Sequence, residues 1–401
     1  MRLLIAVSLV ISAAAQASWD AELHLLPPAR VAEFNARCLD GSPPGYFIRR
    51  NASSTDWKLH IQGGGWCTSP SDCHSRAQGL LGSSSSWPRW LSAFWPPEGA
   101  GFYGLMDANA SSSPFGSYNF VWVGYCDGSS QTSNRDAPLV YNGTSLYLRG
   151  AAILDAVLAE LEAQERFLST ASAVIVSGTS AGGLSTYLHA SYFAARISSP
   201  AARVVAVPDA GFFYDHEAYP PGSNNHRWLS TIAAATSSAL WNSTLRGPLS
   251  ACLAAPPGGE LARCYLPEGA FAWQTVPFFI INSLADPANL QIVEGLACDP
   301  YSGCDAAQLA ALAQYAADLQ AAILAVIVPS RDSYFLSSCY QHEETCRAAD
   351  WYGITIGGQT MAQTFANWFS AGVGEAARRI DVAWPGDASC QPQGGPPHGA
   401  C

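Results

Sequence analysis

The segment 177–183, with the sequence SGTSAGG, constrains this chain more than any other stretch. Before it, residues 173–176 form a short, β-branched apolar run, which predicts a buried strand. After it, apolar residues recur at helical spacing as far as Ile197, which predicts a helix. A strand, a Gly-x-Ser-x-Gly turn and a helix in this order are typical of a nucleophile elbow, in which the Ser180 hydroxyl stands beside the helix N-terminus. The simpler alternative is a glycine-rich turn whose serine only caps the helix.

Composition and the order of elements indicate one large α/β domain. The chain has 401 residues, of which 49% are hydrophobic and 13% charged, enough for a large core. Strand and helix patterns alternate, which predicts a doubly wound, mostly parallel sheet with long loop excursions. Strands are expected at 46–48, 58–62, 120–123, 173–176, 203–207, 277–281 and 334–336, and helices at 148–168, 184–197, 306–326 and 360–369. Residues 68–117 lack a sustained period and predict an ordered loop insertion near the site.

The N-terminus has the pattern of a secretory signal. Arg2 precedes an apolar run over 3–11, and Ala15-Gln16-Ala17 is a small-x-small cleavage site. The alternative, a membrane anchor, needs a longer apolar run. We expect a signal peptide at 1–17, a single domain at 18–385, a Pro/Gly-rich tail at 386–401, no membrane span, and a secreted, monomeric protein.

Twelve cysteines agree with export. Their number is even and no CxxC pair occurs, so disulfides are a better interpretation than a metal or redox site. Cys67–Cys73 is predicted as a local clip, and spacing makes Cys252–Cys264 and Cys298–Cys304 plausible pairs. Glycosylation sequons begin at Asn51, Asn109, Asn142 and Asn242. The net charge of −11 makes nucleic acid and anionic membranes unsuitable partners.

A catalytic serine requires a base and a group that orients the base. In α/β hydrolases the chain order is serine, acid, histidine, and the acid follows a strand. Asp286 follows the strand predicted at 277–281, and His342 follows a later apolar run and Cys339. Asp209 and Asp215 also follow a strand, but an aspartate before a long excursion more often holds a loop through backbone N–H groups. The histidines judged less suitable by position are His189, His216, His226 and His398.

An oxyanion hole requires N–H donors aimed at one point. The residue after the serine, Ala181, supplies one donor. Gly63-Gly64-Gly65 follows an early strand and is similar to the glycine-rich oxyanion loop of esterases, because backbone rather than side chain must face the substrate. A flexible turn is the alternative. We expect Gly64 and Gly65 to donate, Trp66 to cap the acyl side of the site, and no metal or other cofactor to be required.

The chain resembles the pectin acetylesterase family, which includes the Notum-type carboxylesterases. The matching stretches run in family order from residue 38 to about residue 370: CLDGSPP at 38–44, IQGGGWC at 61–67, Cys73 through Arg76, LGSS at 81–84, YCDGSS at 125–130, LYLRG at 146–150, SGTSAGGLS at 177–185, DAGFFYD at 209–215 and SSCYQH at 337–342. The resemblance implies an α/β-hydrolase fold and a secreted serine esterase. It assigns catalysis to Ser180, Asp286 and His342 and oxyanion binding to Gly64, Gly65 and Ala181, and it supports a Cys38–Cys126 disulfide.

Departures from the family pattern concern the substrate. The three glycines before Trp66 are similar to plant pectin acetylesterases, whereas Glu343 is similar to the Notum side, and plant members differ around Asp286 at Ala285 and Pro287. The expected function is removal of O-acetyl groups from an extracellular or cell-wall polysaccharide, with a preference for short acyl groups. The alternatives are a lipid deacylase acting on a secreted acylated protein, and a non-catalytic binding protein.

Overall fold

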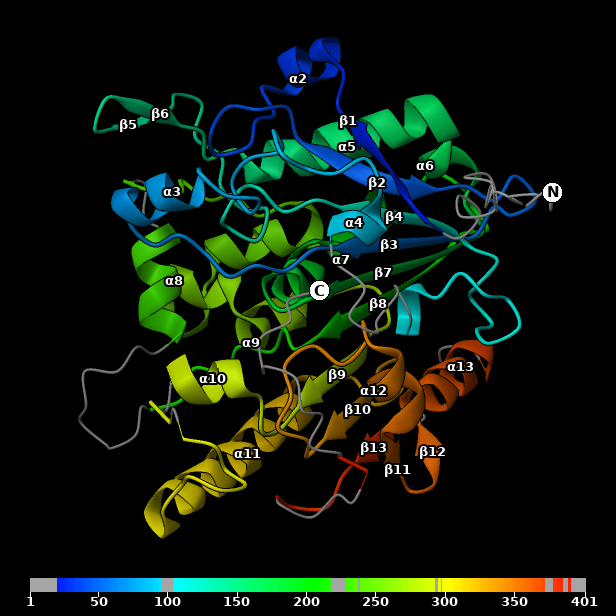
Figure 1. Cartoon of the computed structure of the whole chain (residues 1–401), viewed down its shortest axis with the longest axis vertical. Coiled ribbons are helices and arrows are strands. Elements are labelled where there is room, and N and C mark those ends of the chain that lie inside the picture. Colours follow the sequence, from blue (N-terminus) through cyan, green and yellow to red (C-terminus); the bar gives the residue numbers. More distant parts are fainter. Residues whose placement is uncertain are drawn as a thin grey trace, which may run out of the picture.

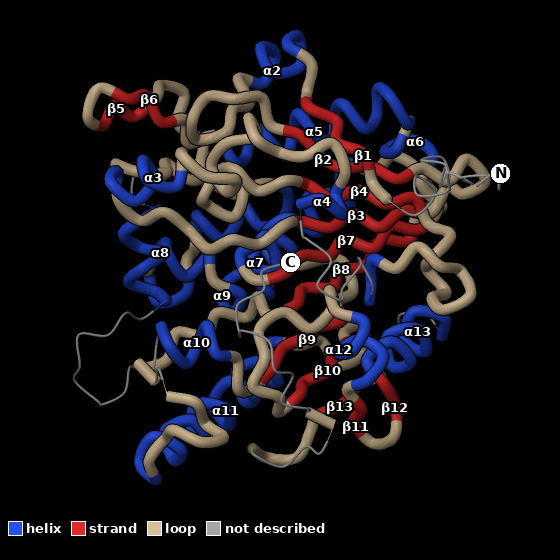
Figure 2. Tube along the Cα trace, in the orientation of Figure 1, coloured by secondary structure: helices blue, strands red, loops and turns tan. Residues whose placement is uncertain are grey.

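The computed structural model describes residues 20–94, 104–217, 228–236, 239–292, 295–296, 298–371, 378–384 and 389–390. A nine-stranded sheet crosses the middle of the described chain (Figure 1, Figure 2). In spatial order its strands are β1 (Glu22–Leu25), β2 (Gly45–Arg49), β4 (Asn119–Val123), β3 (Trp57–Ile61), β7 (Ala173–Thr179), β8 (Arg203–Asp209), β9 (Phe279–Ser283), β10 (Ser333–Ser337) and β13 (Arg378–Ile380).

The sheet is mostly parallel. Only the pairs β1–β2 and β2–β4 are antiparallel, and the neighbours from β4 to β13 all pair in parallel. Two small hairpins, β5 (Leu139–Tyr141) with β6 (Thr144–Leu146) and β11 (Thr355–Ile356) with β12 (Gln359–Thr360), lie outside it. The expected α/β architecture is confirmed.

Helices are inserted between the strands. The α-helices are α2 (Pro28–Phe34), α3 (Pro70–Arg76), α4 (Leu91–Phe94), α5 (Gly150–Glu165), α6 (Phe167–Thr170), α7 (Ala181–Arg196), α8 (Trp228–Thr236), α9 (Pro267–Ala270), α10 (Pro287–Ile292), α11 (Ala306–Val326), α12 (Ala348–Gly353) and α13 (Met361–Ala371). The 3₁₀ turns are η1 (Gly104–Met106), η2 (Gly247–Ala254), η3 (Pro257–Gly259), η4 (Leu261–Tyr265) and η5 (Phe271–Trp273).

Adjacent residues of β9 show that helices cover both faces of the sheet. Successive side chains of a strand point to opposite faces. Phe278, immediately before β9, stacks on Tyr187 of α7 with ring centroids 5.6 Å apart. Phe279 instead packs against Phe365 of α13 at 5.2 Å. These rings are buried in the main hydrophobic core, which is therefore a two-sided, doubly wound arrangement.

The predicted strands and the long helix 306–326 are all present, but the sheet extends further at both edges. The edge strands β1 and β13 were not predicted, because each is short and lacks a continuous apolar run. The helix expected at 148–168 is divided into α5 and α6, since Arg166 between them takes a positive φ of 56°. The signal expected at 1–17 lies outside the described residues, as does most of the tail expected at 386–401.

Five disulfides join described cysteines. The predicted pairs Cys38–Cys126, Cys67–Cys73, Cys252–Cys264 and Cys298–Cys304 are confirmed. A fifth, Cys339–Cys390, joins the segment after β10 to a residue 51 positions further on.

Among the described helices, α11 is long and apolar enough to cross a membrane by length and composition alone. It packs as a domain helix, with Tyr315 and Leu319 of one face buried in the main core. Asp318 in its middle lies 3.1 Å from Nε2 of His216.

Candidate active site

The candidate residues follow the carboxyl ends of neighbouring parallel strands, where ligands bind in open α/β sheets. The loop of Gly64 follows β3, Ser180 follows β7, Asp286 follows β9 and His342 follows β10. Register pairs place these ends side by side: Ile61 opposite Gly178, and Ser337 opposite Ser283. The sheet thus gathers at one edge residues that are far apart in the sequence.

Ser180 has the backbone of a nucleophile elbow. Its φ of 54° and ψ of −124° lie in a region that side-chain-bearing residues rarely adopt, and α7 begins at the next residue. A Cβ on Gly182 would overlap the carbonyl oxygen of Ile61, so only glycine allows this close approach of helix and strand. The Ser180 side chain makes no cap hydrogen bond to α7, and the capping alternative is therefore not supported.

His342 and Asp286 are in direct contact. Nδ1 of His342 lies 2.8 Å from Oδ2 and 2.9 Å from Oδ1 of Asp286, which is fully buried. Oδ1 of Asp286 also accepts the N–H of Ala288 at 2.8 Å, so the carboxylate is held in place at the start of α10. Gly63 lies between Ser180 and the residue that follows His342: a Cβ on Gly63 would lie 3.0 Å from the Ser180 Cβ and 3.1 Å from Oε1 of Glu343.

The charges around His342 favour its protonated form. Burial lowers the pKa of the imidazole, but the Asp286 carboxylate, through its charge and its hydrogen bond, outweighs burial and raises the pKa to about 9. Glu343 and Asp209 add smaller contributions in the same direction. Once His342 is neutral and takes a proton, the buried Asp286 carboxylate stabilises the positive charge that results.

The competing aspartates bind loops, as expected for structural residues. Oδ2 of Asp209 accepts the N–H groups of Glu344 and Thr345, at 2.8 and 2.7 Å, and the Thr345 hydroxyl at 2.7 Å. Burial raises the pKa of Asp209 to about 6 against these hydrogen bonds. Asp215 accepts the N–H of Leu229 at 2.8 Å and so holds the start of α8.

The remaining histidines lie in other settings. His189 is buried on α7, where Nε2 lies 3.1 Å from the carbonyl of Ser130, and burial lowers its pKa to about 4. His216 is next to Asp318. His226 and His398 lie outside the described residues.

The loop after β3 lies beside the elbow, since a Cβ on Gly63 would meet the Thr179 carbonyl oxygen and the Ser180 Cβ. Gly64 and Gly65 have positive φ values of 144° and 66°, conformations that favour glycine. Their carbonyls accept hydrogen bonds from Arg76 and Tyr125, while within the described residues their N–H groups donate to no protein acceptor. The same holds for the N–H of Ala181 at the first position of α7. No protein group in the described part of the chain therefore competes with a bound molecule for these N–H groups.

Trp66 is wedged into an aromatic cluster. Its ring meets Phe213 edge-on at 4.8 Å and Trp228 of α8 at 5.4 Å, and its Nε1–H donates to the Ser130 hydroxyl at 2.7 Å. The side chain is only half-buried, so one part of the ring remains available to line a site.

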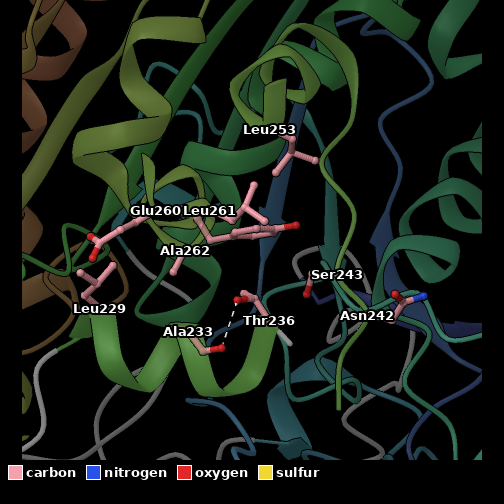
Figure 3. Close-up of a pocket in the computed structure, with 10 residues that line it drawn as sticks. Leu229, Ala233, Thr236, Asn242, Ser243, Leu253, Glu260, Leu261 and Ala262 are labelled. Carbon is pink, nitrogen blue, oxygen red and sulfur yellow. Dashed lines mark hydrogen bonds between the residues drawn. The ribbon is translucent and has the colours of Figure 1, made fainter. Parts of the chain in front are cut away.

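A separate pocket of about 660 Å³ is lined by residues of α8, η2 and η4 and of the segments next to them (Figure 3). It is lined by Leu229, Ala233, Thr236, Asn242, Ser243, Leu253, Glu260, Leu261, Ala262 and Tyr265, and includes none of the predicted site residues. Among the residues that the structure describes, no group of three or more His, Cys, Asp or Glu side chains could hold a metal ion.

Sequence reasoning did not predict the side chains that hold the glycine loop. Arg76, Tyr125 and Ser130 all lie in stretches that resemble the family, but their contacts depend on separate loops folding together. Glu343 was noted for its identity but not for its place against Gly63 and Ser180.

Comparisons with known proteins agree with this fold. The family model described as Pectinacetylesterase matches residues 14–391. Pectin acetylesterase 7 of Arabidopsis thaliana is 32% identical over 375 residues, which cover 89% of this chain and 88% of that protein. Palmitoleoyl-protein carboxylesterase NOTUM of Homo sapiens is 27% identical over 72% of this chain and 55% of that protein. The solved structure of the Wnt deacylase Notum from Drosophila superposes with a TM-score of 0.74 at 23% identity, covering 91% of this chain and 97% of that one.

The fold and these relatives define a carboxylic ester hydrolase built on an α/β-hydrolase-like sheet. Within that class, the chain belongs to the pectinacetylesterase family, whose model covers most of its length.

Proposed function

We propose that this protein is a secreted serine esterase that removes O-acetyl groups from an extracellular polysaccharide through Ser180, His342 and Asp286. The observation that carries the proposal is the contact of His342 Nδ1 with both oxygens of the buried Asp286 carboxylate. The strained elbow backbone of Ser180 supports its role as the nucleophile. The substrate class is taken from the pectin acetylesterases among its relatives. The disulfides between described cysteines suit the oxidising compartments through which secreted proteins pass.

The reaction follows from the roles of these groups. Ser180 Oγ attacks the acetyl carbonyl while Nε2 of His342 takes its proton, and Asp286 stabilises the imidazolium. The carbonyl oxygen, now an anion, accepts N–H groups of Gly64, Gly65 and Ala181; each such donor contributes roughly 3 kcal/mol to transition-state stabilisation. The sugar hydroxyl leaves with the proton from His342. Water, deprotonated by the same histidine, then releases acetate and restores Ser180.

Trp66 and Gly65 support a preference for short acyl groups. A Cβ on Gly65 would meet only Arg76 Nη2, at 3.7 Å, so this position contributes no wall to an acyl tunnel. Trp66 is held against Phe213 and Trp228, and a long acyl chain would have to displace that packed aromatic surface.

The first experiment replaces the nucleophile. Ser180→Ala is expected to abolish hydrolysis of p-nitrophenyl acetate and of acetylated pectin, with little change in the melting temperature, because the hydroxyl makes no structural hydrogen bond to α7. Ser243→Ala, in the separate pocket, is the matched control and should keep full activity. Activity of Ser180→Ala within a few-fold of wild type would remove Ser180 from the mechanism.

A lipid deacylase is the second candidate, favoured by the position of Glu343 beside Ser180 and by the Notum relatives. The two functions separate on an ester series with one alcohol and acetyl, butyryl or octanoyl groups. Each buried methylene of a true lipid pocket adds about 0.8 kcal/mol. We expect kcat/KM to be highest for acetyl; a value that climbs through octanoyl would favour the deacylase.

A further inference from the structure

All three carbonyls of the loop Gly64–Gly65–Trp66 are held by side chains behind the site. Arg76 Nη1 donates to the Gly64 carbonyl at 2.7 Å, and Nη2 donates to the Trp66 carbonyl at 3.1 Å. Between them, the Tyr125 hydroxyl donates to the Gly65 carbonyl at 2.6 Å. No carbonyl of the loop is therefore left to face the substrate.

These contacts determine where the N–H groups point. The C=O and N–H of one trans peptide are rigidly opposed. Fixing the Gly64 carbonyl on Arg76 consequently sets the direction of the Gly65 N–H, which belongs to the same peptide. The Tyr125 contact fixes the following peptide, which carries the Trp66 N–H, and so holds the backbone on the other side of Gly65. Glycines alone would leave these peptides free to rotate, because they have no side chain to restrict them.

Arg76 is committed to this task. Within the part of the chain that the structure describes it forms no ion pair, and its side-chain hydrogen bonds go to the two loop carbonyls. Arg76 is the last residue of α3, and the Cys67–Cys73 disulfide ties that helix back to the loop. The positive charge lies on the carbonyl side of the Gly64–Gly65 peptide, and it polarises the N–H on the opposite side of that peptide toward stronger donation.

Ser130 connects the loop to the elbow. Its N–H donates to the Tyr125 hydroxyl at 3.1 Å. Its own hydroxyl accepts Trp66 Nε1–H and donates to the Ala181 carbonyl, both at 2.7 Å. Ser130 is buried and has a φ of 49°, a strained backbone conformation. Its hydrogen bonds to Tyr125, Trp66 and Ala181 hold it in that conformation.

We infer that Arg76 is a positioning residue of the oxyanion hole, supported by Tyr125 and Ser130. Arg76 sets the direction of the Gly65 N–H before substrate arrives, while Tyr125 and Ser130 hold the neighbouring peptides of the loop and of α7. The inference rests on the proposed esterase function. Preorganised donors act on the charge of the transition state more than on the neutral substrate. Loss of these side chains should therefore lower kcat with little change in KM.

The test compares Arg76→Gln, Arg76→Lys and Tyr125→Phe with wild type on p-nitrophenyl acetate. We expect kcat to fall roughly 30-fold or more in Arg76→Gln, by less in Arg76→Lys, which keeps the charge but not the two-pronged geometry, and roughly 10-fold in Tyr125→Phe. KM should stay within about three-fold. The inhibition constant of a boronic acid, which forms a tetrahedral anion on Ser180, should rise in parallel with the loss of kcat/KM.

Ser133→Ala is the matched control. Ser133 is buried in the same segment, but its hydroxyl accepts the N–H of Gly150 at the start of α5 and does not touch the loop. It should lower the melting temperature without lowering kcat per folded molecule. If Arg76→Gln does not fold, the test of the positioning role uses Tyr125→Phe, which removes only one oxygen atom.

Three outcomes distinguish the positioning role from the esterase function. A kcat within three-fold of wild type in the folded Arg76→Gln or Tyr125→Phe variant overturns the positioning role while the esterase function stands. Equal rises in KM and in the boronic acid constant, with kcat unchanged, show that the side chains bind substrate instead and also overturn it. Unchanged activity in Ser180→Ala overturns the proposed function and, with it, this inference.

Discussion

At the scale of single residues, two buried aspartates lie close to the site but are satisfied by different partners. Asp286 turns both oxygens to His342, whereas Asp209 turns one oxygen to the backbone and hydroxyl of the segment that follows His342. Because both residues follow a strand, the sequence predicts both as candidates for the acid that orients the histidine. Only the folded contacts distinguish the one that orients the imidazole from the one that holds its loop.

Asp286→Asn is expected to lower kcat on the order of 10⁴-fold, because an amide holds the imidazole in the wrong tautomer. Asp209→Asn should lower kcat far less, since an amide oxygen still accepts the N–H groups of Glu344 and Thr345. The measurement is kcat on one acetyl ester at a fixed pH. A larger loss in Asp209→Asn than in Asp286→Asn would reverse the assignment.

A second prediction concerns pH. Only neutral His342 can take the Ser180 proton, so kcat/KM should rise as pH rises through the pKa of His342, and the midpoint should lie above the usual histidine range because that pKa is raised. Glu343→Gln removes a negative charge that contributes to this raised pKa, so the midpoint should move to lower pH. Glu33→Gln on the exposed face of α2 is the control and should leave the midpoint unchanged. A midpoint that stays or rises in Glu343→Gln would exclude its electrostatic role.

At the scale of elements, the periodicity of apolar residues was sufficient to predict the central strands and the helices α7 and α11 from the sequence. The edge strands β1 and β13 could not be predicted in this way. They are strands because they pair with β2 and β10, and such tertiary contacts override a weak local preference. The sequence GGGW at 63–66 was sufficient to predict a glycine-rich loop after β3. Its support by Arg76 could not be predicted, since α3 lies in a stretch without periodicity.

Releasing α3 from the loop should affect stability and turnover together. A Cys67→Ser, Cys73→Ser double variant is expected to lose about 2 kcal/mol of unfolding free energy, and kcat should also fall because Arg76 ends the released helix. The control is the Cys252, Cys264 pair changed to serine, which joins η2 to η4 and should reduce stability without reducing kcat. Denaturant unfolding and steady-state kinetics give the two readouts. Unchanged kcat in the first variant would contradict the coupling.

At the scale of the whole molecule, the net charge of the chain affects how fast it meets a charged substrate. This property follows from the composition and not from any single motif. The chain carries a net charge of −11, and acetylated polygalacturonate is itself a polyanion. Long-range repulsion between two anions slows their encounter, and salt screens it over about 30 Å at 0.01 M and about 8 Å at 0.15 M.

Raising the ionic strength from 0.01 to 0.15 M should therefore increase kcat/KM several-fold on acetylated polygalacturonate and leave it nearly constant on neutral acetylated xylan. Initial rates of acetate release at sub-saturating substrate measure both. A kcat/KM that falls with salt on the polyanion would instead indicate a basic cleft within the acidic surface.

The Cys339–Cys390 disulfide bears on the timing of biosynthesis. Translation proceeds from the N-terminus, so the oxyanion loop and Ser180 leave the ribosome long before the segment that carries His342. That segment is covalently secured only after residue 390 has also emerged and been oxidised. The proposed nucleophile is thus made first, and the segment of its proposed base is anchored later in maturation. A nascent or reduced chain therefore carries Ser180 without a secured His342.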